Sequence, residues 1–141
     1  MTYSNTESVK IANERSQNTL MAHLGIEYTI IEPDHIEAIM PVTQNHTQPM
    51  GLLHGGATLA LAESVGSLGS AMQVDLDKYA VVGLNMTCSH TKSALVGQTV
   101  RAIARIIHRG RSTHIWNIDV VNEEEKLISS CRLTNYIKPL Q

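Results

Sequence analysis

Residues 54–72 read HGGATLALAESVGSLGSAM, and the spacing of their apolar side chains predicts the one long helix of this chain. Leu61, Val65, Leu68 and Met72 fall at positions i, i+4, i+7 and i+11. At about 100° per residue these four side chains lie within about 60° of each other. We therefore expect a helix that begins after His54, ends near Met72 and buries this stripe in the core.

The opposite face of this helix carries small residues and a single carboxylate. Its members are Gly56, Leu59, Ala60, Glu63, Gly66, Ser67 and Ser70. Small residues let a second backbone or a ligand approach closely, so we expect both faces to be covered and Glu63 to be at least partly desolvated. A desolvated carboxylate beside a cleft is a candidate general base or nucleophile. The alternative is an ordinary surface glutamate.

His54, Gly55 and Gly56 precede the helical pattern and are typical of an oxyanion site. Backbone N–H groups are free at a helix N-terminus, and the helix dipole there favours negative charge. The two glycines allow a substrate carbonyl to approach this backbone. Glycine is also an ordinary N-cap, so it is the combination with Glu63 further along the helix that favours catalysis.

Six strands and a short helix are predicted around the long helix. The expected strands are residues 26–31, 36–42, 81–91, 98–108, 113–121 and 127–137, the short helix is residues 14–24, and residues 43–51 form a loop. Short polar connections favour antiparallel pairing. The order predicts one α+β domain over residues 1–141, with about residues 1–13 loosely ordered. The free edges of a single sheet favour dimerisation.

Composition restricts the class of protein. The 141 residues are 43% hydrophobic and 17% charged, and the net charge of −2 argues against a nucleic-acid partner. No segment approaches the roughly 20 apolar residues of a membrane span, and residues 1–15 lack the apolar run of a signal peptide. Two cysteines, Cys88 and Cys131, do not make a disulfide framework. We therefore expect a cytoplasmic protein with reduced thiols and no membrane partner.

The small net charge conceals a basic block. Residues 78–118 hold no Asp or Glu but 6 of the 11 lysines and arginines. They are Lys78, Lys92, Arg101, Arg105, Arg109 and Arg111. This segregation favours an anionic ligand, above all at the turn of residues 108–112, whose cations and N–H groups suit phosphates. The alternative is a set of cations that face solvent.

Several catalytic motifs are absent from the sequence. There is no Walker A loop and no Gly-x-Gly-x-x-Gly after a predicted strand, so phosphoryl transfer from a nucleotide is not expected. The histidines and cysteines lack metal-ligand spacing, so no metal is expected. No Gly-x-Ser-x-Gly turn is present, which argues against a serine hydrolase.

Residues 48–57, QPMGLLHGGA, and residues 61–67, LAESVGS, resemble the signature of the hotdog-fold acyl-CoA thioesterases. The most similar subgroup includes 1,4-dihydroxy-2-naphthoyl-CoA, 4-hydroxybenzoyl-CoA and phenylacetate-pathway thioesterases. The resemblance covers the chain from about Met21 to Ile137. It implies a hotdog fold, in which a curved six-stranded antiparallel sheet wraps around the long central helix. It also implies subunits paired edge to edge, frequent homotetramers, and active sites at the dimer interface.

The resemblance also implies roles for individual residues. The implied catalytic set is Glu63, His54, Gly55, Gln48 and Ser67. Glu63 corresponds to the nucleophile or general base, and the Gly55 N–H, near His54, corresponds to the group that polarises the thioester carbonyl. The implied coenzyme A set is Gly83, His90, Lys92, Arg109, Gly110, Arg111 and Ser112. No separate cofactor is expected, because coenzyme A is part of the substrate.

The expected activity is hydrolysis of an acyl-CoA to the free acid and CoA. The resemblance favours an aryl-CoA, such as 1,4-dihydroxy-2-naphthoyl-CoA, and with it menaquinone biosynthesis. Two alternatives remain, a hotdog hydratase or dehydratase acting on acyl thioesters and a non-catalytic acyl-CoA-binding protein. The His-Gly-Gly sequence at the helix start favours hydrolysis. Because the chain contains no Phe, the acyl pocket is expected to consist of aliphatic side chains, methionine and few rings.

Overall fold

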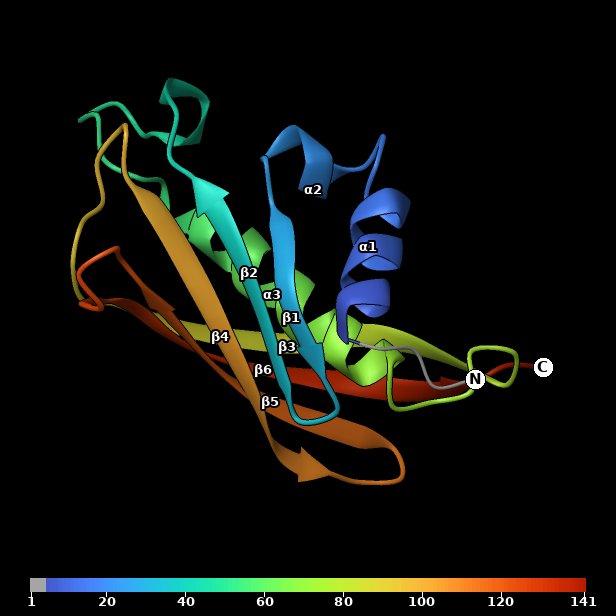
Figure 1. The fold of residues 1–141 in the computed structure, drawn as a ribbon. Coiled ribbons are helices and arrows are strands. Elements are labelled where there is room, and N and C mark those ends of the chain that lie inside the picture. Colours follow the sequence, from blue (N-terminus) through green and yellow to red (C-terminus); the bar gives the residue numbers. More distant parts are fainter. Residues whose placement is uncertain (1–4) are drawn as a thin grey trace.

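The computed structural model describes residues 5–141 of the chain (Figure 1). The helices are α1 (Asn5–Arg15), α2 (Leu20–His23), the 3₁₀ turn η1 (Gln44–His46) and α3 (Gly55–Ala71). The strands are β1 (Glu27–Glu32), β2 (His35–Pro41), β3 (Tyr79–His90), β4 (Thr99–Arg109), β5 (Thr113–Val121) and β6 (Leu127–Pro139). The six predicted strands and the long helix are therefore confirmed, and the loop predicted at residues 43–51 includes η1.

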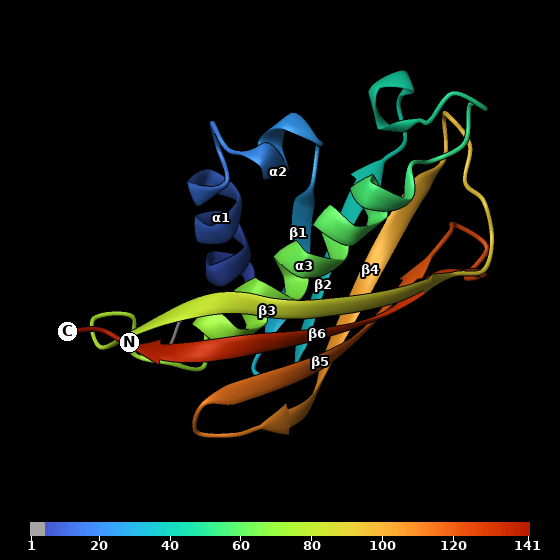
Figure 2. The ribbon, with the colours of Figure 1, turned by 180° about the vertical axis from the view of Figure 1, so that it is seen from behind.

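The strands form one antiparallel sheet in the order β1-β2-β4-β5-β6-β3. Figures 1 and 2 show that this sheet curves around α3, which lies along its concave face. The connection that contains α3 carries the chain from β2 across the sheet to β3 at the far edge. This arrangement confirms the predicted α+β fold, with a long central helix wrapped by a six-stranded sheet.

Three of the four residues in the predicted apolar stripe on α3 contribute to the core, with Leu68 only partly buried against it. Leu61 and Val65 are completely buried, whereas Met72 is 49% exposed. Gly66 and Ser70, expected on the face away from the core, are instead buried. The buried face of α3 is thus rotated from the predicted one. Gly66 and Ser70 are covered as expected, but by the sheet of the same chain.

Large side chains of the sheet explain this rotation. Leu133 on β6 lies against Gly66, where an added Cβ would come within 2.6 Å of its Cδ2. The ring of Trp116 on β5 lies against Gly69 in the same way. Both large side chains are fully buried. The helix therefore presents its glycines to the sheet because a larger residue there would overlap the core side chains.

The N-terminal region is ordered differently from the prediction. Residues 5–13, expected to be loosely ordered, belong to α1; the first four residues covered by that expectation lie outside the described part of the chain. The single helix predicted over residues 14–24 is also wrong. The chain leaves α1 at Arg15, Asn18 adopts a left-handed φ of 63°, and Thr19 caps the separate short helix α2.

Helix α1 is ordered because it caps the edge of β1. The Asn13 side chain donates to the Tyr28 carbonyl oxygen (3.0 Å) and accepts from the Tyr28 N–H (2.8 Å). Asn5 Oδ1 accepts from the Ile31 N–H (2.8 Å). These side-chain amides take the place of a neighbouring strand, so this edge is closed to further pairing.

The other edge of the sheet is open. Strand β3 is 12 residues long and pairs with β6 on one side only. Tyr79, Val82 and Leu84 on β3 are 37%, 41% and 59% exposed. A long edge strand with exposed apolar side chains is a template for pairing with another chain.

Candidate active site

The N-terminus of α3 is fixed by two histidines. His54 is the N-cap, and its Nδ1 accepts a hydrogen bond from the Gly56 N–H (2.8 Å). Because Nδ1 accepts, the neutral ring carries its proton on Nε2, which can donate to a ligand. The His54 N–H in turn donates to the His46 carbonyl oxygen (2.8 Å). Within residues 5–141 no acceptor receives the Gly55 N–H.

His46 is a structural residue that the sequence analysis missed. It is 5% exposed, and the Thr43 N–H donates to its Nδ1 (3.1 Å) while its Nε2 donates to the Leu24 carbonyl oxygen (2.6 Å). It thereby joins the C-terminal end of α2 to the segment that precedes α3. The spacing Thr43-x-x-His46 is a capping pattern and was the one available signal in the sequence.

A first pocket lies at the start of α3, beside Gly55. It has a volume of about 370 Å³, and Gln48, Gly55, His90 and Lys92 are among its lining residues. Gln48 lies in a tight turn, where its Oε1 accepts from the Met50 N–H and leaves the amide nitrogen as the free donor. The structure thus brings together four of the residues that the sequence analysis selected.

His90 packs directly on the start of α3. An added Cβ at Gly55 would lie 2.7 Å from His90 Nε2, so the ring rests on the glycine Cα. A hydrogen bond of 2.7 Å between His90 Nδ1 and the hydroxyl of the buried Ser129 fixes the ring. Glycine is required at position 55 by this contact as well as by any ligand that approaches its N–H.

A second pocket contains Glu63 and Ser67. Its volume is about 540 Å³, and the rest of its lining is mainly apolar. The other residues are Leu20, Met21, Tyr28, Ala60, Ser64, Leu68, Ala71, Leu76 and Val81. Tyr28 is 2% exposed, its hydroxyl donates to the Ser64 carbonyl oxygen (3.1 Å), and burial raises the pKa of its phenol well above the usual range. The apolar part of the lining is aliphatic, with one methionine and one ring.

Glu63 is exposed in the single chain, so the expectation that it is desolvated is wrong for one copy of the protein. Its carboxylate lies against β3, where an added Cβ at Gly83 would be 2.5 Å from Glu63 Oε1. The structure therefore places Gly83 beside Glu63, away from Lys92. A pairing irregularity between Gly83 and Asn85 marks the same point of β3.

The two pockets are separate within one chain. Gly55 and Glu63 are eight residues apart on α3. At the rise of an α-helix, their backbones are about 12 Å apart along the axis. A single thioester carbonyl cannot lie about 3 Å from both groups. One chain thus holds two half-sites, a donor half at Gly55 and a carboxylate half at Glu63.

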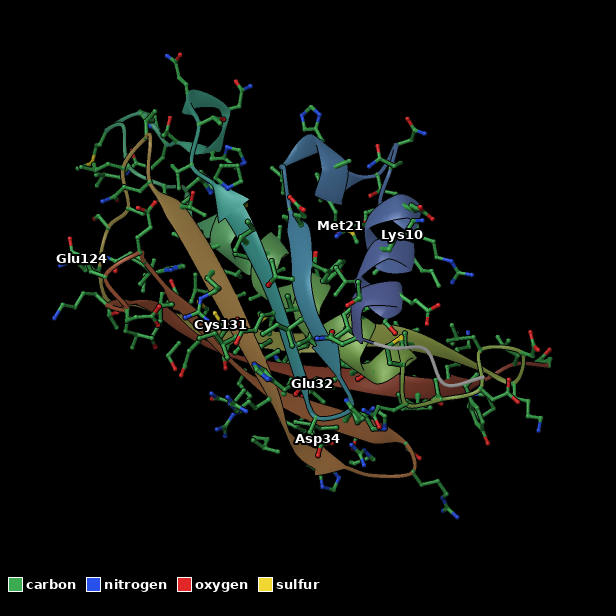
Figure 3. The ribbon with its side chains drawn as sticks, in the orientation of Figure 1. Lys10, Met21, Glu32, Asp34, Glu124 and Cys131 are labelled. Atoms are coloured by element: carbon green, nitrogen blue, oxygen red, sulfur yellow. The ribbon has the colours of Figure 1, made fainter. Side chains whose placement is uncertain are left out.

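Several cations of the basic block form ion pairs with Asp and Glu residues from outside residues 78–118. Arg101 contacts Glu37 and Glu125 at 2.7 Å each, and Arg109 contacts Asp34 at 2.5 Å. Figure 3 shows Asp34 in the turn between β1 and β2, beside the end of β4. Lys78 lies 3.4 Å from Asp75. Lys92, Arg105 and Arg111 have no ion pair among residues 5–141.

The two parts of the predicted coenzyme A set lie at opposite ends of β4. Lys92 belongs to the loop between β3 and β4, and Arg109 is the last residue of β4. Figure 2 shows that this loop and the turn after β4 lie at opposite ends of the strand. A strand of this length spans about 30 Å. In the turn after β4, the Gly110 N–H donates to the Thr113 carbonyl oxygen (2.8 Å), and Arg111 and Ser112 are exposed. Arg111 and Lys92 therefore cannot hold the same phosphate within one chain.

A buried polar cluster joins α3 to strands β5 and β6. Ser70 Oγ accepts two hydrogen bonds, from Trp116 Nε1 (2.9 Å) and Asn135 Nδ2 (2.8 Å). Because both lone pairs of the hydroxyl are then used, its proton is donated to His114 Nδ1 (3.1 Å). Asn135 Nδ2 also donates to the Gly66 carbonyl oxygen (3.2 Å). His114 is therefore neutral in the folded protein. No sequence pattern indicated this cluster, because its members come from three elements.

Acidification is expected to lower the free energy of unfolding through His114. Burial, together with the charges of Arg109 and His108, lowers the pKa of His114 below 6.5. The unfolded chain then binds a proton that the folded chain does not. The stabilisation is thus complete above pH 6.5 and is lost as the pH falls toward the lowered pKa. The urea concentration at the midpoint of unfolding is measured at about pH 7.5 and at about pH 5.5. The decrease between the two pH values should be larger in wild type than in His114→Gln, and equal decreases would contradict this assignment.

Two kinds of site are not found in the described part of the chain. No group of His, Cys, Asp or Glu side chains within residues 5–141 is placed to hold a metal ion. None of the helices described here is long and apolar enough to cross a membrane.

Comparison with known proteins places this geometry in context. The sequence model of the thioesterase superfamily matches residues 50–129. A glutamine-to-alanine mutant of thioesterase PA1618 from Pseudomonas aeruginosa is 38% identical, with 94% of each chain covered and a TM-score of 0.90. Thioesterase HI1161 from Haemophilus influenzae is 37% identical, with 99% of this chain and 94% of that chain covered and a TM-score of 0.89. A mutant of thioesterase SAV0944 from Staphylococcus aureus is 42% identical, with 85% of this chain and 98% of that chain covered and a TM-score of 0.82.

Proposed function

Because the chain belongs to the thioesterase superfamily and is a thioester hydrolase, we propose that it hydrolyses an acyl-CoA at a site built from two copies of the chain. The observation that carries this proposal is the separation of Gly55 and Glu63 on one helix. Each group suits one part of thioester hydrolysis, yet in one chain they are about 12 Å apart. A second copy, paired through the open edge of β3, supplies the missing half.

The open edge of β3 favours this pairing. The opposite edge is capped by α1, whereas β3 exposes Val82 and Leu84 next to Gly83, which contacts Glu63. Pairing two β3 strands extends the sheet into the partner and brings the partner's α3 toward this helix. It also covers the exposed face on which Glu63 lies, which supplies the desolvation that a single chain lacks. A homodimer is therefore the smallest active assembly in this proposal.

Hydrolysis then proceeds with defined roles for the two half-sites. The Glu63 carboxylate removes a proton from water, and the resulting hydroxide attacks the thioester carbonyl carbon; alternatively the carboxylate attacks directly and water hydrolyses the anhydride. The Gly55 N–H and His54 Nε2–H of the other copy stabilise the oxyanion. Collapse expels CoA as the thiolate, which is then protonated. Gln48 positions the thioester or the water, and Ser67 lies one turn from Glu63 to assist it.

The pocket beside Glu63 supports a ring-sized acyl group. Its volume of about 540 Å³ is within the range of small-molecule pockets. Leu68, Leu76 and Val81 supply apolar contacts, and Tyr28 supplies one ring edge. We take 1,4-dihydroxy-2-naphthoyl-CoA as the example of such an aryl-CoA, with menaquinone biosynthesis as the corresponding pathway.

A substrate panel tests this choice. Release of free CoA is measured with a thiol reagent for aryl-CoA, medium-chain acyl-CoA and short-chain acyl-CoA esters at matched concentrations. The proposal expects the largest kcat/KM for an aryl-CoA. A clear preference for straight-chain esters would reject the aryl assignment and leave the hydrolase itself intact.

The nucleotide end of CoA is assigned to exposed cations. Lys92 lies in the Gly55 pocket, near His90, and Arg111 has no ion pair within residues 5–141. Lys92 and Arg111 lie at opposite ends of β4. Arg111 is therefore assigned to the nucleotide of a CoA that is bound at the Gly55 pocket of another copy. Arg109, Gly110 and Ser112 belong to the same turn.

Arg111→Ala is expected to raise KM for a CoA ester by about 10–10²-fold, because a charge-assisted phosphate contact contributes about 1.5–3 kcal/mol. The KM for the matching pantetheine ester, which lacks the nucleotide, should stay within about twofold of wild type. Lys10→Ala, in the exposed part of α1, is the matched control for loss of one positive charge. Equal effects of Arg111→Ala on both esters would argue against a phosphate contact.

A further inference from the structure

Two cysteines that the proposed mechanism does not use lie side by side on neighbouring strands. Cys88 on β3 and Cys131 on β6 are directly opposite in the antiparallel register. Both thiols are free, and their sulfur atoms are 2.6 Å apart. They are separated by 43 positions in the sequence, so only the fold brings them together.

The geometry of this pair suits a disulfide. A disulfide needs a Cα–Cα separation of about 4.4–6.8 Å and a sulfur–sulfur distance of about 2.05 Å. Residues directly opposite in an antiparallel ladder have Cα atoms about 4.5–5.5 Å apart. The two sulfurs of Cys88 and Cys131 therefore need to move together by only about half an ångström, with no change in the register of β3 and β6.

The two sulfurs differ in access. Cys131 is 2% exposed and belongs to the core, whereas Cys88 is half-buried. Burial and the adjacent Cys88 sulfur raise the pKa of the Cys131 thiol well above its usual range. Cys131 is therefore the shielded sulfur, and Cys88 is the sulfur that an external reagent meets first.

We propose that Cys88 and Cys131 are a reversible thiol modification site that forms an intramolecular disulfide by exchange with a small disulfide such as oxidised glutathione. The Cys88 thiolate attacks the small disulfide, forms a mixed disulfide and releases one glutathione thiolate. The Cys131 sulfur, after losing its proton, attacks the Cys88 sulfur and expels the second glutathione. The two protons of the cysteines end on two reduced glutathione molecules, so the protein loses two electrons and the small disulfide gains them.

The modification acts next to the donor half-site. His90 follows Cys88 by two residues on β3, and its Nδ1 lies 4.0 Å from Cys88 Sγ. Its partner Ser129 precedes Cys131 by two residues on β6, so the disulfide lies beside the His90–Ser129 hydrogen bond. The bond also closes a long loop of the unfolded chain, which should raise the midpoint of thermal unfolding.

The test follows the thiols of the purified, folded protein during incubation with oxidised glutathione. Remaining thiols are alkylated under denaturing conditions and counted by intact mass spectrometry. Wild type should lose two alkylatable thiols and two hydrogen atoms of mass, carry no glutathione, and recover with a reductant. Cys131→Ser should instead stop at one glutathione adduct on Cys88, and Cys88→Ser should keep Cys131 unmodified. If Cys131→Ser does not fold, Cys131→Ala replaces it.

The proposal fails if wild type keeps both thiols under conditions in which Cys131→Ser becomes glutathionylated. It fails equally if wild type retains a stable glutathione adduct on Cys88, or if the new disulfide joins two chains on a non-reducing gel. These results do not depend on thioester hydrolysis, so the modification site stands or falls separately from the proposed function.

Discussion

Glu63→Gln is expected to lower kcat for acyl-CoA hydrolysis by about 10²–10⁴-fold, the usual contribution of a positioned base. Glutamine keeps the size and hydrogen-bonding shape of glutamate but neither accepts a proton from water at neutral pH nor attacks the carbonyl. Because glutamine has nearly the same size as glutamate and carries no charge that must be desolvated in the paired site, the substitution should not lower the free energy of unfolding by more than about 1 kcal/mol. Steady-state kinetics and urea unfolding of the same preparations measure both effects.

The matched control is Glu124→Gln in the turn between β5 and β6, an exposed residue that lines neither of the two pockets. It removes one exposed carboxylate of the same type and should leave kcat unchanged. A folded Glu63→Gln variant with kcat close to wild type would remove Glu63 from the mechanism. Equal losses in the two variants would point to net charge as the cause.

Gly83→Ala is expected to produce the second largest loss, up to about 10²-fold in kcat, through displacement of the Glu63 carboxylate. The new Cβ would lie 2.5 Å from Glu63 Oε1, so this oxygen has to move. The carboxylate is the far end of a flexible side chain, so its movement should cost little stability. We therefore expect a lower kcat with an unfolding midpoint close to that of wild type. Kinetics and urea unfolding of the purified variant check both expectations.

The double variant Gly83→Ala/Glu63→Gln distinguishes positioning from a general disturbance of β3. If Gly83 acts only by placing Glu63, the double variant should be no slower than Glu63→Gln alone. Additive losses in the two single variants would instead assign Gly83 a separate role, such as the contact with coenzyme A that the family resemblance implies.

The fold was largely predictable from the sequence because its periodicities are local. Alternation in residues 113–121 and the short polar turns predict antiparallel pairing, and the apolar spacing of Leu61 and Val65 identifies α3. The rotation of α3 was not predictable. It depends on Trp116 and Leu133, which arrive from distant strands to fill the space above two helix glycines. Glycine on a helix face indicates that another group packs closely against the helix, but the sequence does not identify that group.

The candidate site was predictable as a set of residues but not as an arrangement. The sequence places Gly55 and Glu63 on one helix and gives no indication that they face different pockets. Charge along the chain was similarly misleading, since Arg101 is paired with Glu37 from another strand. The helix α1 was missed because its order depends on two asparagine side chains that bind the edge of β1. Each failure concerns a contact between residues far apart in the sequence.

Simultaneous measurement of thiol and acid release by the purified protein tests thioester hydrolysis at this site most directly. An aryl-CoA ester is incubated with wild type and with Glu63→Gln, free CoA is followed with a thiol reagent, and the acyl product is quantified by chromatography. The account predicts equal amounts of CoA and free acid from wild type and a rate about 10²–10⁴-fold lower from Glu63→Gln. Ester consumption without release of CoA, or the same rate of release from both proteins, would contradict it.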